Sequence, residues 1–302
     1  MAILAPGEGA ELIAITGVTG GIGGRVAAIL SRQNLPLRLI ARDPSKVTGF
    51  PESDIAQANY DDEHAMARAL SGVSSMLFVS GREHIDRLKQ HQKVVAAAAL
   101  ARVPKVVYTS FLNANPNATF TLARQHYHTE QFIRQSGAEF VFLRDSLYAD
   151  YLPYLCGSDG AIRGPAGSGR ASFVTRDDVA DAAVAVLTTD TYDGQVLDIT
   201  GPEALTMQEA ADLLSQVTGR VISYVPETVE EAYASRAHYQ APDWEVEGWV
   251  SSYQAIANGE METVSPAVET LTFHRPRSVR EFLAANPQSY AHLTQSQGDA
   301  SP

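Results

Sequence analysis

The chain has 302 residues, of which 45% are hydrophobic and 19% are charged, and its formal net charge is -12. This length is enough for one large α/β domain with an appended lobe, or for two domains. The acidic balance argues against nucleic-acid binding, which normally needs a basic face. The lysines are scarce and form no polybasic patch for a membrane surface: they are Lys46, Lys89, Lys93 and Lys105.

Cys156 is the only cysteine, so the chain forms no internal disulfide and no cysteine-rich metal site. An unpaired thiol is more typical of a reducing cytoplasm than of a secreted protein. The first residues carry no basic flank and no apolar stretch of signal length. No run approaches the roughly 20 apolar residues that a membrane span needs. We therefore expect a cytoplasmic protein without a metal or a membrane partner.

Short apolar runs rich in branched and aromatic residues alternate with helical stretches. The runs are continuous rather than alternating, which is typical of strands buried on both faces of a parallel sheet. Strands are predicted at residues 11–16, 35–41, 54–59, 74–80, 104–110, 139–144 and 194–200. The order of elements predicts an α/β fold, a Rossmann-like doubly wound parallel sheet.

Two of the intervening helices have a readable apolar face. One follows the first strand and places Ile22, Val26, Ile29 and Leu30 on one side. The other is predicted over residues 83–101, with one stripe made of Ile85, Leu88, Val95 and Ala99. Both helices should cover the sheet with these faces.

After Thr200 the pattern changes to a smaller, mostly helical lobe. Thr206 and Glu209 form a capping-box pair at the start of a helix, and Gly219 suits its end. We predict an NAD(P)-binding domain over residues 1–200 and a substrate-binding lobe over 201–285, which can include segments near 145–170. Residues 286–302 are predicted to be a flexible tail. Three aromatic residues of the lobe pack in its core or form a lid: Trp244, Trp249 and Tyr253.

The first strand is followed by TGVTGGIGGRVAAIL, in which Gly17, Gly20 and Gly23 stand at regular spacing. The first glycine permits a tight turn, and the second lets backbone N–H groups approach a pyrophosphate. The third allows the helix to pack closely on the strand. The start of the helix also offers unpaired donors and the positive end of its dipole. With a strand before and an amphipathic helix after, the motif predicts a dinucleotide site.

The end of the second strand, IARDPSK, indicates which dinucleotide is bound. An NAD site places a carboxylate here for the ribose 2′-hydroxyl. The position is taken by Ala41 and then Arg42, whose guanidinium suits a 2′-phosphate, and Lys46 adds a second positive charge. The competing interpretation makes Asp43 the ribose ligand and leaves Arg42 in solvent. We favour NADP(H) over NAD(H).

Further cofactor positions follow from the topology, because dinucleotides bind at the carboxyl ends of the strands. Tyr60 and Asp61, after the third strand, are predicted to flank the adenine. Ser80, Gly81 and Arg82, after the fourth strand, are predicted to lie at the switch point. Thr109, which ends the fifth strand, is predicted to bind ribose or substrate.

Several segments together resemble the NmrA-like atypical short-chain dehydrogenases, in particular the type 2 NADPH:quinone oxidoreductases and triphenylmethane reductases. They are TGVTGGIGG, ARDPSK, LFVSG, VVYTSFLNA, HYHTE and FLRDSLY. The resemblance implies a Rossmann domain, NADP(H), a cleft under a small lobe and reduction of quinone-like acceptors. It carries the dinucleotide loop to Gly17, Thr19, Gly20, Gly21, Ile22 and Gly23, the phosphate-selecting arginine to Arg42 and a helix histidine to His126. These relatives commonly have asparagine where this chain has Asp145.

No tyrosine in the chain has a lysine four residues later; Tyr127, for example, is followed at that spacing by Gln131. The Ser-Tyr-Lys system of many short-chain dehydrogenases uses that lysine to lower the tyrosine pKa for proton transfer. Its absence makes alcohol dehydrogenation and epimerisation less favourable. A quinone or dye spreads the negative charge of hydride addition over its π system, so proximity and orientation suffice.

We therefore predict an NADPH-dependent oxidoreductase that passes hydride directly to a quinone or similar conjugated acceptor. Secondary catalytic roles are assigned to His126 as a proton donor, Tyr127 as a stacking residue and Tyr148 as a residue lining the substrate cleft. The alternatives are a non-catalytic NADP(H) sensor with a protein partner, and a specialised biosynthetic reductase or isomerase. The expected partner is a small aromatic substrate, and a homodimer is the assembly to be tested.

Overall fold

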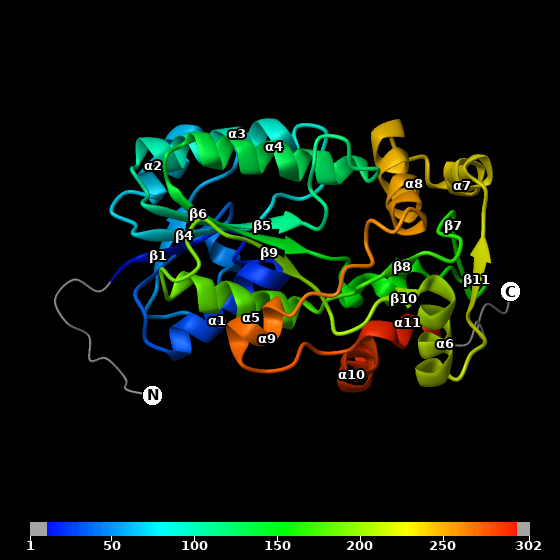
Figure 1. Ribbon diagram of the computed structural model, residues 1–302. Helices are drawn as coiled ribbons and strands as arrows, with labels where there is room; N and C mark the ends of the chain where they lie inside the picture. Colours follow the sequence, from blue (N-terminus) through cyan, green and yellow to red (C-terminus); the bar gives the residue numbers. More distant parts are fainter. Residues whose placement is uncertain (1–10, 295–302) are drawn as a thin grey trace, which may run out of the picture. The chain divides into compact units, whose positions relative to one another are not determined.

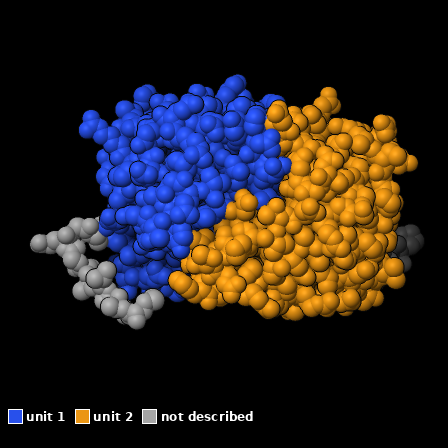
Figure 2. Space-filling view, in the orientation of Figure 1, with its two compact units in different colours: residues 1–116, 125–144, 179–197 blue, residues 117–124, 145–178, 198–302 orange. Residues whose placement is uncertain are grey.

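The computed structural model describes residues 11–294, and within them the chain divides into two compact units. The first unit comprises residues up to 116 together with residues 125–144 and 179–197, and the second comprises residues 117–124, 145–178 and those from 198 onward (Figure 2).

The first unit is built on a seven-stranded sheet with the order β3-β2-β1-β4-β5-β6-β9. Pairs β1–β2, β1–β4, β2–β3 and β4–β5 are parallel, with Ile13 opposite both Leu37 and Ser75. The strands are β1 (Ile13–Ile15), β2 (Leu37–Ala41), β3 (Asp54–Gln57), β4 (Ser75–Phe78), β5 (Lys105–Phe111), β6 (Glu139–Asp145) and β9 (Val196–Ile199). This order and the flanking helices confirm the predicted Rossmann-like fold.

Helices cover both faces of this sheet (Figure 1). One face carries α2 (Glu63–Ala69), α3 (Arg87–Leu100) and α4 (Thr121–Gln135), and the other carries α1 (Gly21–Arg32) and α5 (Arg176–Leu187). A short 3-10 helix, η1 (Pro44–Lys46), follows β2. The core beneath α2, α3 and α4 is formed by fully buried side chains such as Met66, Met76, Phe78, Tyr108 and Phe142.

The second unit contains two small sheets and the C-terminal helices. β7 (Ala161–Gly164) pairs in parallel with β11 (Ser223–Pro226), and β8 (Arg170–Ala171) pairs antiparallel with β10 (Leu205–Thr206). The helical elements are η2 (Ala149–Leu155), α6 (Met207–Thr218), α7 (Val229–Arg236), η3 (Ala237–Tyr239), α8 (Asp243–Ala257), α9 (Ala267–Thr272), α10 (Val279–Ala285), η4 (Pro287–Tyr290) and α11 (Ala291–Thr294). The predicted capping box of Thr206 and Glu209 is present at α6, which ends at Gly219 with φ 68°.

The predicted stripe of the helix over residues 83–101 is wrong at two positions. The helix begins only at Arg87, so Ile85 lies before it and is 61% exposed, and Ala99 is exposed as well. The buried face instead includes Arg87 and His91 next to Val94 and Val95. Hydrogen bonds within the unit satisfy these two polar side chains, and a search for apolar periodicity does not register them.

The division into units differs from the predicted contiguous domains, because the chain crosses between the units several times before residue 200. The segment predicted as a flexible tail begins with η4 and α11, in which Leu293 is buried and its carbonyl accepts a hydrogen bond from Arg220. Residues 295–302 lie outside the described residues. Among the described helices, none has the length and hydropathy to cross a membrane.

Candidate active site

The glycine turn joins β1 to α1 in the first unit. Gly17 has φ 63°, a left-handed conformation that favours glycine, and its carbonyl accepts from Gly20 N at 2.8 Å. A Cβ on Gly23 would lie 2.5 Å from Gly17 O and 2.6 Å from Thr16 O, so only glycine lets the helix start this close to the strand. The turn therefore has the packing that the spacing of the glycines predicts.

The first turn of α1 is open to an anion. Gly20 is its N-cap and supplies no side-chain hydrogen bond to the first N–H groups, and the turn contains no acidic residue. Thr19 and Gly20 are exposed, Gly21 is half-buried and Ile22 points inward. Backbone donors at a helix start favour phosphate groups. The residues of the turn fit the pyrophosphate of a dinucleotide.

The end of β2 distinguishes between the two candidate ribose ligands. Arg42 is exposed. The carboxylate of Asp43 accepts from Ser45 N at 3.1 Å and Ser45 Oγ at 2.6 Å and caps η1. The hydrogen bonds from Ser45 hold the pKa of Asp43 below its usual value. Because Asp43 has this structural role, the geometry favours Arg42, with the exposed Lys46 one turn away, as the group that meets the ribose.

Tyr60, predicted beside the adenine, connects the ends of β1 and β4. Its Oη lies 2.7 Å from both Thr16 Oγ1 and Val79 O, and its ring packs against Phe78 at a centroid distance of 5.5 Å. Burial raises the pKa of Tyr60, so the phenol stays neutral. Asp61 is exposed, and its carboxylate accepts from Gln90. The adenine contact stays a prediction for both residues.

The residues after β4 are fixed through their backbone. Ser80 N donates to Thr109 Oγ1 and Gly81 N donates to His91 Nε2, each at 2.8 Å. These two N–H groups are therefore not available to a ligand. The predicted cofactor contacts here must come from the Ser80 side chain, from carbonyl groups or from the exposed Arg82. Thr109 is buried, and its role at the ribose stays a prediction.

A buried hydrogen-bonded chain fixes the tautomers of two histidines. His91 Nε2 accepts from Gly81, so its proton is on Nδ1, which lies 2.9 Å from Thr129 Oγ1. Tyr108 Oη lies 3.4 Å from His91 Nδ1 and 2.9 Å from His126 Nδ1. Because His91 Nδ1 already carries a proton, the Tyr108 hydroxyl donates to His126 Nδ1. His126 consequently carries its proton on Nε2. The chain links the end of β4, α3, β5 and α4 in one unit.

His126 is neutral near neutral pH. It is 6% exposed, and burial, with Arg87 and His91 adding to it, lowers its pKa well below the usual value. Burial, together with the charge of Arg87, also lowers the pKa of His91 well below its usual value. The structure therefore favours His126 as a neutral N–H donor over an imidazolium that gives up a proton.

The two candidate tyrosines have different surroundings. Tyr127 is half-buried on α4, and its ring packs edge-on against that of His128 at a centroid distance of 5.5 Å. Tyr148, in the second unit, is half-buried and its Oη lies 2.8 Å from Asp145 Oδ2. Their catalytic roles stay predictions.

Lys105 cannot replace the lysine that is missing after the tyrosines. It is the first residue of β5, at the end of the strand opposite to that where parallel sheets bind ligands. Its Nζ donates to Thr189 O at 2.6 Å and forms an ion pair with Asp193. The side chain is buried and has a structural role.

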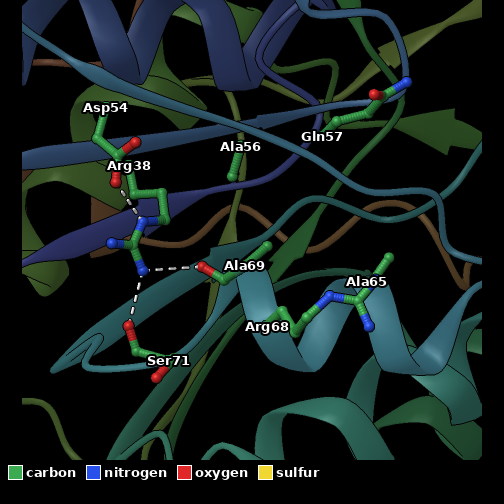
Figure 3. Close-up of a pocket in the computed structure, with 8 residues that line it drawn as sticks. All are labelled: Arg38, Asp54, Ala56, Gln57, Ala65, Arg68, Ala69 and Ser71. Atoms are coloured by element: carbon green, nitrogen blue, oxygen red, sulfur yellow. Dashed lines mark hydrogen bonds and ion pairs between the residues drawn. The ribbon is translucent and has the colours of Figure 1, made fainter.

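A hollow on the first unit lies away from the glycine turn. Arg38 at the start of β2 donates to Asp54 Oδ2 at 2.6 Å and to the carbonyls of Ala69 and Ser71 (Figure 3). Arg38 and Asp54 stand at the amino ends of their strands, whereas Arg42 follows the carboxyl end of β2. The hollow is a structural junction of β2, β3 and α2.

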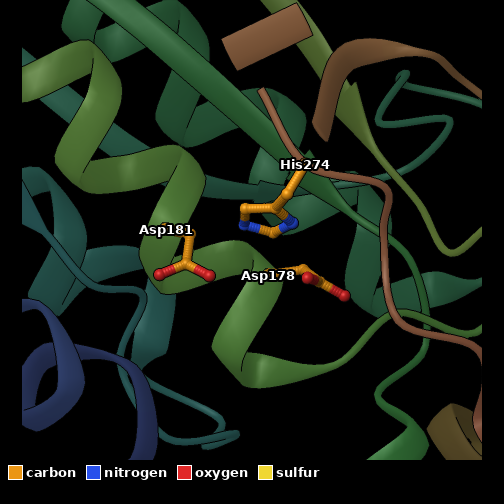
Figure 4. Close-up of side chains that lie close together, drawn as sticks. All are labelled: Asp178, Asp181 and His274. Carbon is orange, nitrogen blue, oxygen red and sulfur yellow. The ribbon is translucent and has the colours of Figure 1, made fainter. Parts of the chain in front are cut away.

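Asp178 lies in the first turn of α5 and is buried in the second unit, with His274 beside it (Figure 4). Its carboxylate accepts from Thr175 Oγ1 at 2.8 Å and from the backbone N and guanidinium of Arg277. Burial raises the pKa of Asp178, and the bonds from Arg277 and Thr175 oppose that rise. This carboxylate ties the segment before α10 to the start of α5.

Residues 9–283 match the NmrA-like family, a span that includes the glycine turn, Arg42 and the histidine chain. The chain belongs to the NmrA-like family. The family predicted from the sequence motifs is thereby confirmed. Within the NmrA-like family the chain is 30% identical over 282 residues to quinone oxidoreductase 2 of Escherichia coli, which covers 90% of this chain and 98% of the relative.

Two solved structures of the NmrA-like fold are similar over nearly their whole length. The crystal structure of the NADPH-dependent quinone oxidoreductase of Escherichia coli complexed with NADPH has a TM-score of 0.83 at 29% identity, covering 90% of this chain and 99% of that chain. The triphenylmethane reductase of Citrobacter sp. complexed with NADP(H) has a TM-score of 0.80 at 29% identity, covering 93% and 99%.

Reasoning from the sequence missed Arg87, His91 and Tyr108 as parts of the site. Arg87 is 3% exposed and donates to Gln125 Oε1 at 2.7 Å. One signal was available: Arg87 and His91 are four residues apart and so share a helical face with Val94 and Val95. Polar residues on an apolar face indicate a buried network.

Proposed function

We propose that this chain is an NADPH-dependent reductase that delivers hydride directly to a quinone or similar conjugated acceptor, without a tyrosine–lysine pair. The observation that carries the proposal is the open glycine turn at the start of α1, with no side-chain cap on its first N–H groups. Those donors suit the pyrophosphate of a dinucleotide. The exposed Arg42, next to an Asp43 that accepts hydrogen bonds from Ser45, suits a 2′-phosphate on its ribose.

Similar reductases with NADPH or NADP(H) support this cofactor and this class of reaction. When bound, the reduced dinucleotide supplies a hydride from its nicotinamide ring. The protein holds the cofactor at the turn and at Arg42. The His91–Tyr108–His126 chain holds the end of β4 in a fixed position. Such positioning is the main contribution needed for an acceptor that stabilises the added charge itself.

The test is NADPH oxidation, followed optically, with a panel of benzoquinones, naphthoquinones and azo dyes. Saturable turnover with at least one acceptor, and a lower KM for NADPH than for NADH, are expected. NADPH binding by calorimetry without turnover on any acceptor would favour the alternative, a cofactor sensor that acts through a protein partner. If neither NADPH nor NADH binds, both the reductase and the cofactor sensor are excluded.

Replacing His126 with glutamine is expected to lower kcat by less than about tenfold. The reason is that His126 is neutral and acts through one N–H group, which the glutamine amide can supply, whereas loss of a true general acid typically lowers the rate by about 100-fold or more. The measurement is kcat for naphthoquinone between pH 6 and pH 9. Loss of several orders of magnitude would favour acid–base chemistry and the biosynthetic reductase or isomerase. His128→Gln, at an exposed histidine of the same helix, controls for damage to α4.

A further inference from the structure

His91, on α3 of the first unit, is a fully buried histidine that accepts a hydrogen bond from the backbone. It is 0% exposed, and its Nε2 accepts from Gly81 N at 2.8 Å. Thr129 Oγ1 donates to Gln125 O at 2.9 Å, so it accepts from His91 Nδ1, which lies 2.9 Å away. Both ring nitrogens of His91 are thereby engaged, and the ring is neutral with its proton on Nδ1.

The surroundings of His91 keep it neutral. Burial and the charge of Arg87, on the same helix, lower the pKa of His91 well below its usual value. Tyr108 Oη, from β5, lies 3.4 Å from His91 Nδ1, and no carboxylate within residues 11–294 is paired with the ring. An imidazolium carries a hydrogen on both nitrogens and cannot accept from Gly81. The bond to the backbone therefore needs the neutral form that the surroundings favour.

The peptide between Ser80 and Gly81 packs directly on this ring. A Cβ on Gly81 would lie 3.2 Å from His91 Nε2 and 3.4 Å from Tyr60 Cδ2, so a side chain here would press the backbone away from His91. The ring of Phe78 lies edge-on to that of His91, at a centroid distance of 5.0 Å. The imidazole is thus held on one side by β4 and meets the peptide on another.

The orientation of the Ser80–Gly81 peptide follows from its bond to His91. In a trans peptide the C=O group points away from the N–H group. Since Gly81 N points to His91 on α3, the Ser80 carbonyl points away from α3, and α1 with the glycine turn lies on the other face of the sheet (Figure 1). Ser80 is half-buried, and its carbonyl accepts no hydrogen bond from the part of the chain that the structure describes. An unpaired carbonyl at this place suits a donor on a ligand.

The segment that carries this carbonyl adjoins the glycine turn. A Cβ on Gly17 would lie 3.0 Å from Val79 Cβ, and Ser80 N donates to Thr109 Oγ1 at 2.8 Å. The two halves of a dinucleotide bind on either side of the point where the strand order reverses, which here lies between β1 and β4. The side of β2 and Arg42 suits the adenine half with its 2′-phosphate. The segment after β4 is then left for the nicotinamide half.

We propose that His91 is a positioning residue for the nicotinamide half of the cofactor: it holds the Ser80–Gly81 peptide so that the Ser80 carbonyl accepts from a hydroxyl or amide donor of that half. This inference rests on the dinucleotide site of the proposed function and is independent of the acceptor. His91 acts through the peptide rather than by contact with the cofactor. Without its Nε2, Gly81 N loses its acceptor and the peptide is free to rotate.

The test compares, by calorimetry, the binding of NADPH with that of 2′,5′-ADP, a fragment with the adenine and the 2′-phosphate but no nicotinamide half. His91→Phe keeps an aromatic ring and removes the acceptor. It should raise the Kd for NADPH by about tenfold, because a hydrogen bond and the orientation of the peptide are lost, and leave the Kd for 2′,5′-ADP within about twofold. A role in folding alone would change both or neither. His64→Phe, at an exposed histidine of α2, is the matched control and should change neither.

Two further variants reach the same peptide. In His91→Gln the amide oxygen can accept from Gly81, so the Kd for NADPH should stay near the wild-type value. Gly81→Ala presses the peptide away from His91 and should also weaken NADPH but not 2′,5′-ADP. The double variant of Gly81→Ala and His91→Phe should bind NADPH no more weakly than the weaker single variant, because both changes displace one peptide. Losses that multiply would contradict the inference.

Nuclear magnetic resonance of the wild-type protein decides the question if His91→Phe does not fold. The nitrogen shifts should show His91 Nε2 without a proton. The amide nitrogen resonance of Gly81, which is sensitive to hydrogen bonding at the Ser80 carbonyl, should shift on addition of NADPH and not of 2′,5′-ADP. A protonated Nε2, or a Gly81 resonance that does not respond to NADPH, would overturn the role of His91.

The outcomes separate this inference from the proposed function. If the wild-type protein binds no dinucleotide, the proposed function fails and the role of His91 falls with it. If the wild type binds NADPH and reduces an acceptor, while His91→Phe keeps the wild-type Kd for NADPH or weakens both ligands equally, only the role of His91 is overturned.

Discussion

Gly23→Ala should lower the free energy of unfolding by about 3 kcal/mol and remove dinucleotide binding. A Cβ at this position would lie 2.5 Å from Gly17 O and 2.6 Å from Thr16 O, and both are backbone atoms of the turn. Neither can move without displacing α1 from β1, and forced overpacking of this kind typically destabilises by about 1–3 kcal/mol or more. Denaturant unfolding and NADPH calorimetry measure the two effects.

Two glycines serve as controls for this substitution. Gly20 has φ -100°, which alanine can adopt, and a Cβ there would lie 3.2 Å from Gly17 O. The Gly20→Ala variant should therefore fold almost normally while binding NADPH more weakly at the exposed turn. Gly248→Ala, inside α8, meets only the flexible side chain of Leu122, at 3.3 Å, and should change neither property by much. Wild-type stability in Gly23→Ala would show that α1 and the turn can separate freely.

Arg42→Asp should raise the Kd for NADPH by about 100-fold and the Kd for NADH by less than about threefold. Hydrogen bonds to charged groups contribute about 1.5–3 kcal/mol, and the new carboxylate adds repulsion of the 2′-phosphate. NADH lacks that phosphate. Because Arg42 is exposed, the substitution should leave the fold intact, and calorimetry with both dinucleotides provides the comparison.

The neighbouring Asp43→Asn provides the matched control. It weakens the cap of η1, in which Asp43 accepts from Ser45, but leaves the guanidinium in place. It should change both Kd values by a similar small factor. A selective loss of NADH binding in Asp43→Asn, with equal effects of Arg42→Asp on both dinucleotides, would make Asp43 the ribose ligand instead.

The individual strands and the helix cap could be predicted because their signals are local. Strand β5 was expected at residues 104–110 and extends from Lys105 to Phe111, and the capping box at Thr206 was read from the spacing of two side chains. Continuous apolar runs and glycine spacing depend on neighbours in the sequence. The discontinuous units could not be predicted, because they depend on which segments pack together after the chain has folded.

The chemistry of the site was less predictable than its scaffold. The glycine turn and Arg42 follow directly from motif spacing, whereas the chain from Gly81 through His91 to Tyr108 and His126 joins the loop after β4 to three elements, α3, β5 and α4. Whether His126 is charged depends on burial and on Arg87, which no local pattern contains. Asp145 was visible in the sequence only as an unusual residue, and its burial with one oxygen unpaired among the described residues emerges from the packing.

The discontinuous first unit also has a consequence for synthesis on the ribosome. Its edge strand β9 is placed next to β6 but follows it by some 50 residues, most of which belong to the second unit. At roughly 5–20 residues per second, the nascent sheet waits several seconds with the backbone of β6 unpaired on that side. An open strand edge of this kind is a target for chaperones and for association between neighbouring nascent chains. Yield on overexpression should therefore depend on how fast codons 146–199 are translated.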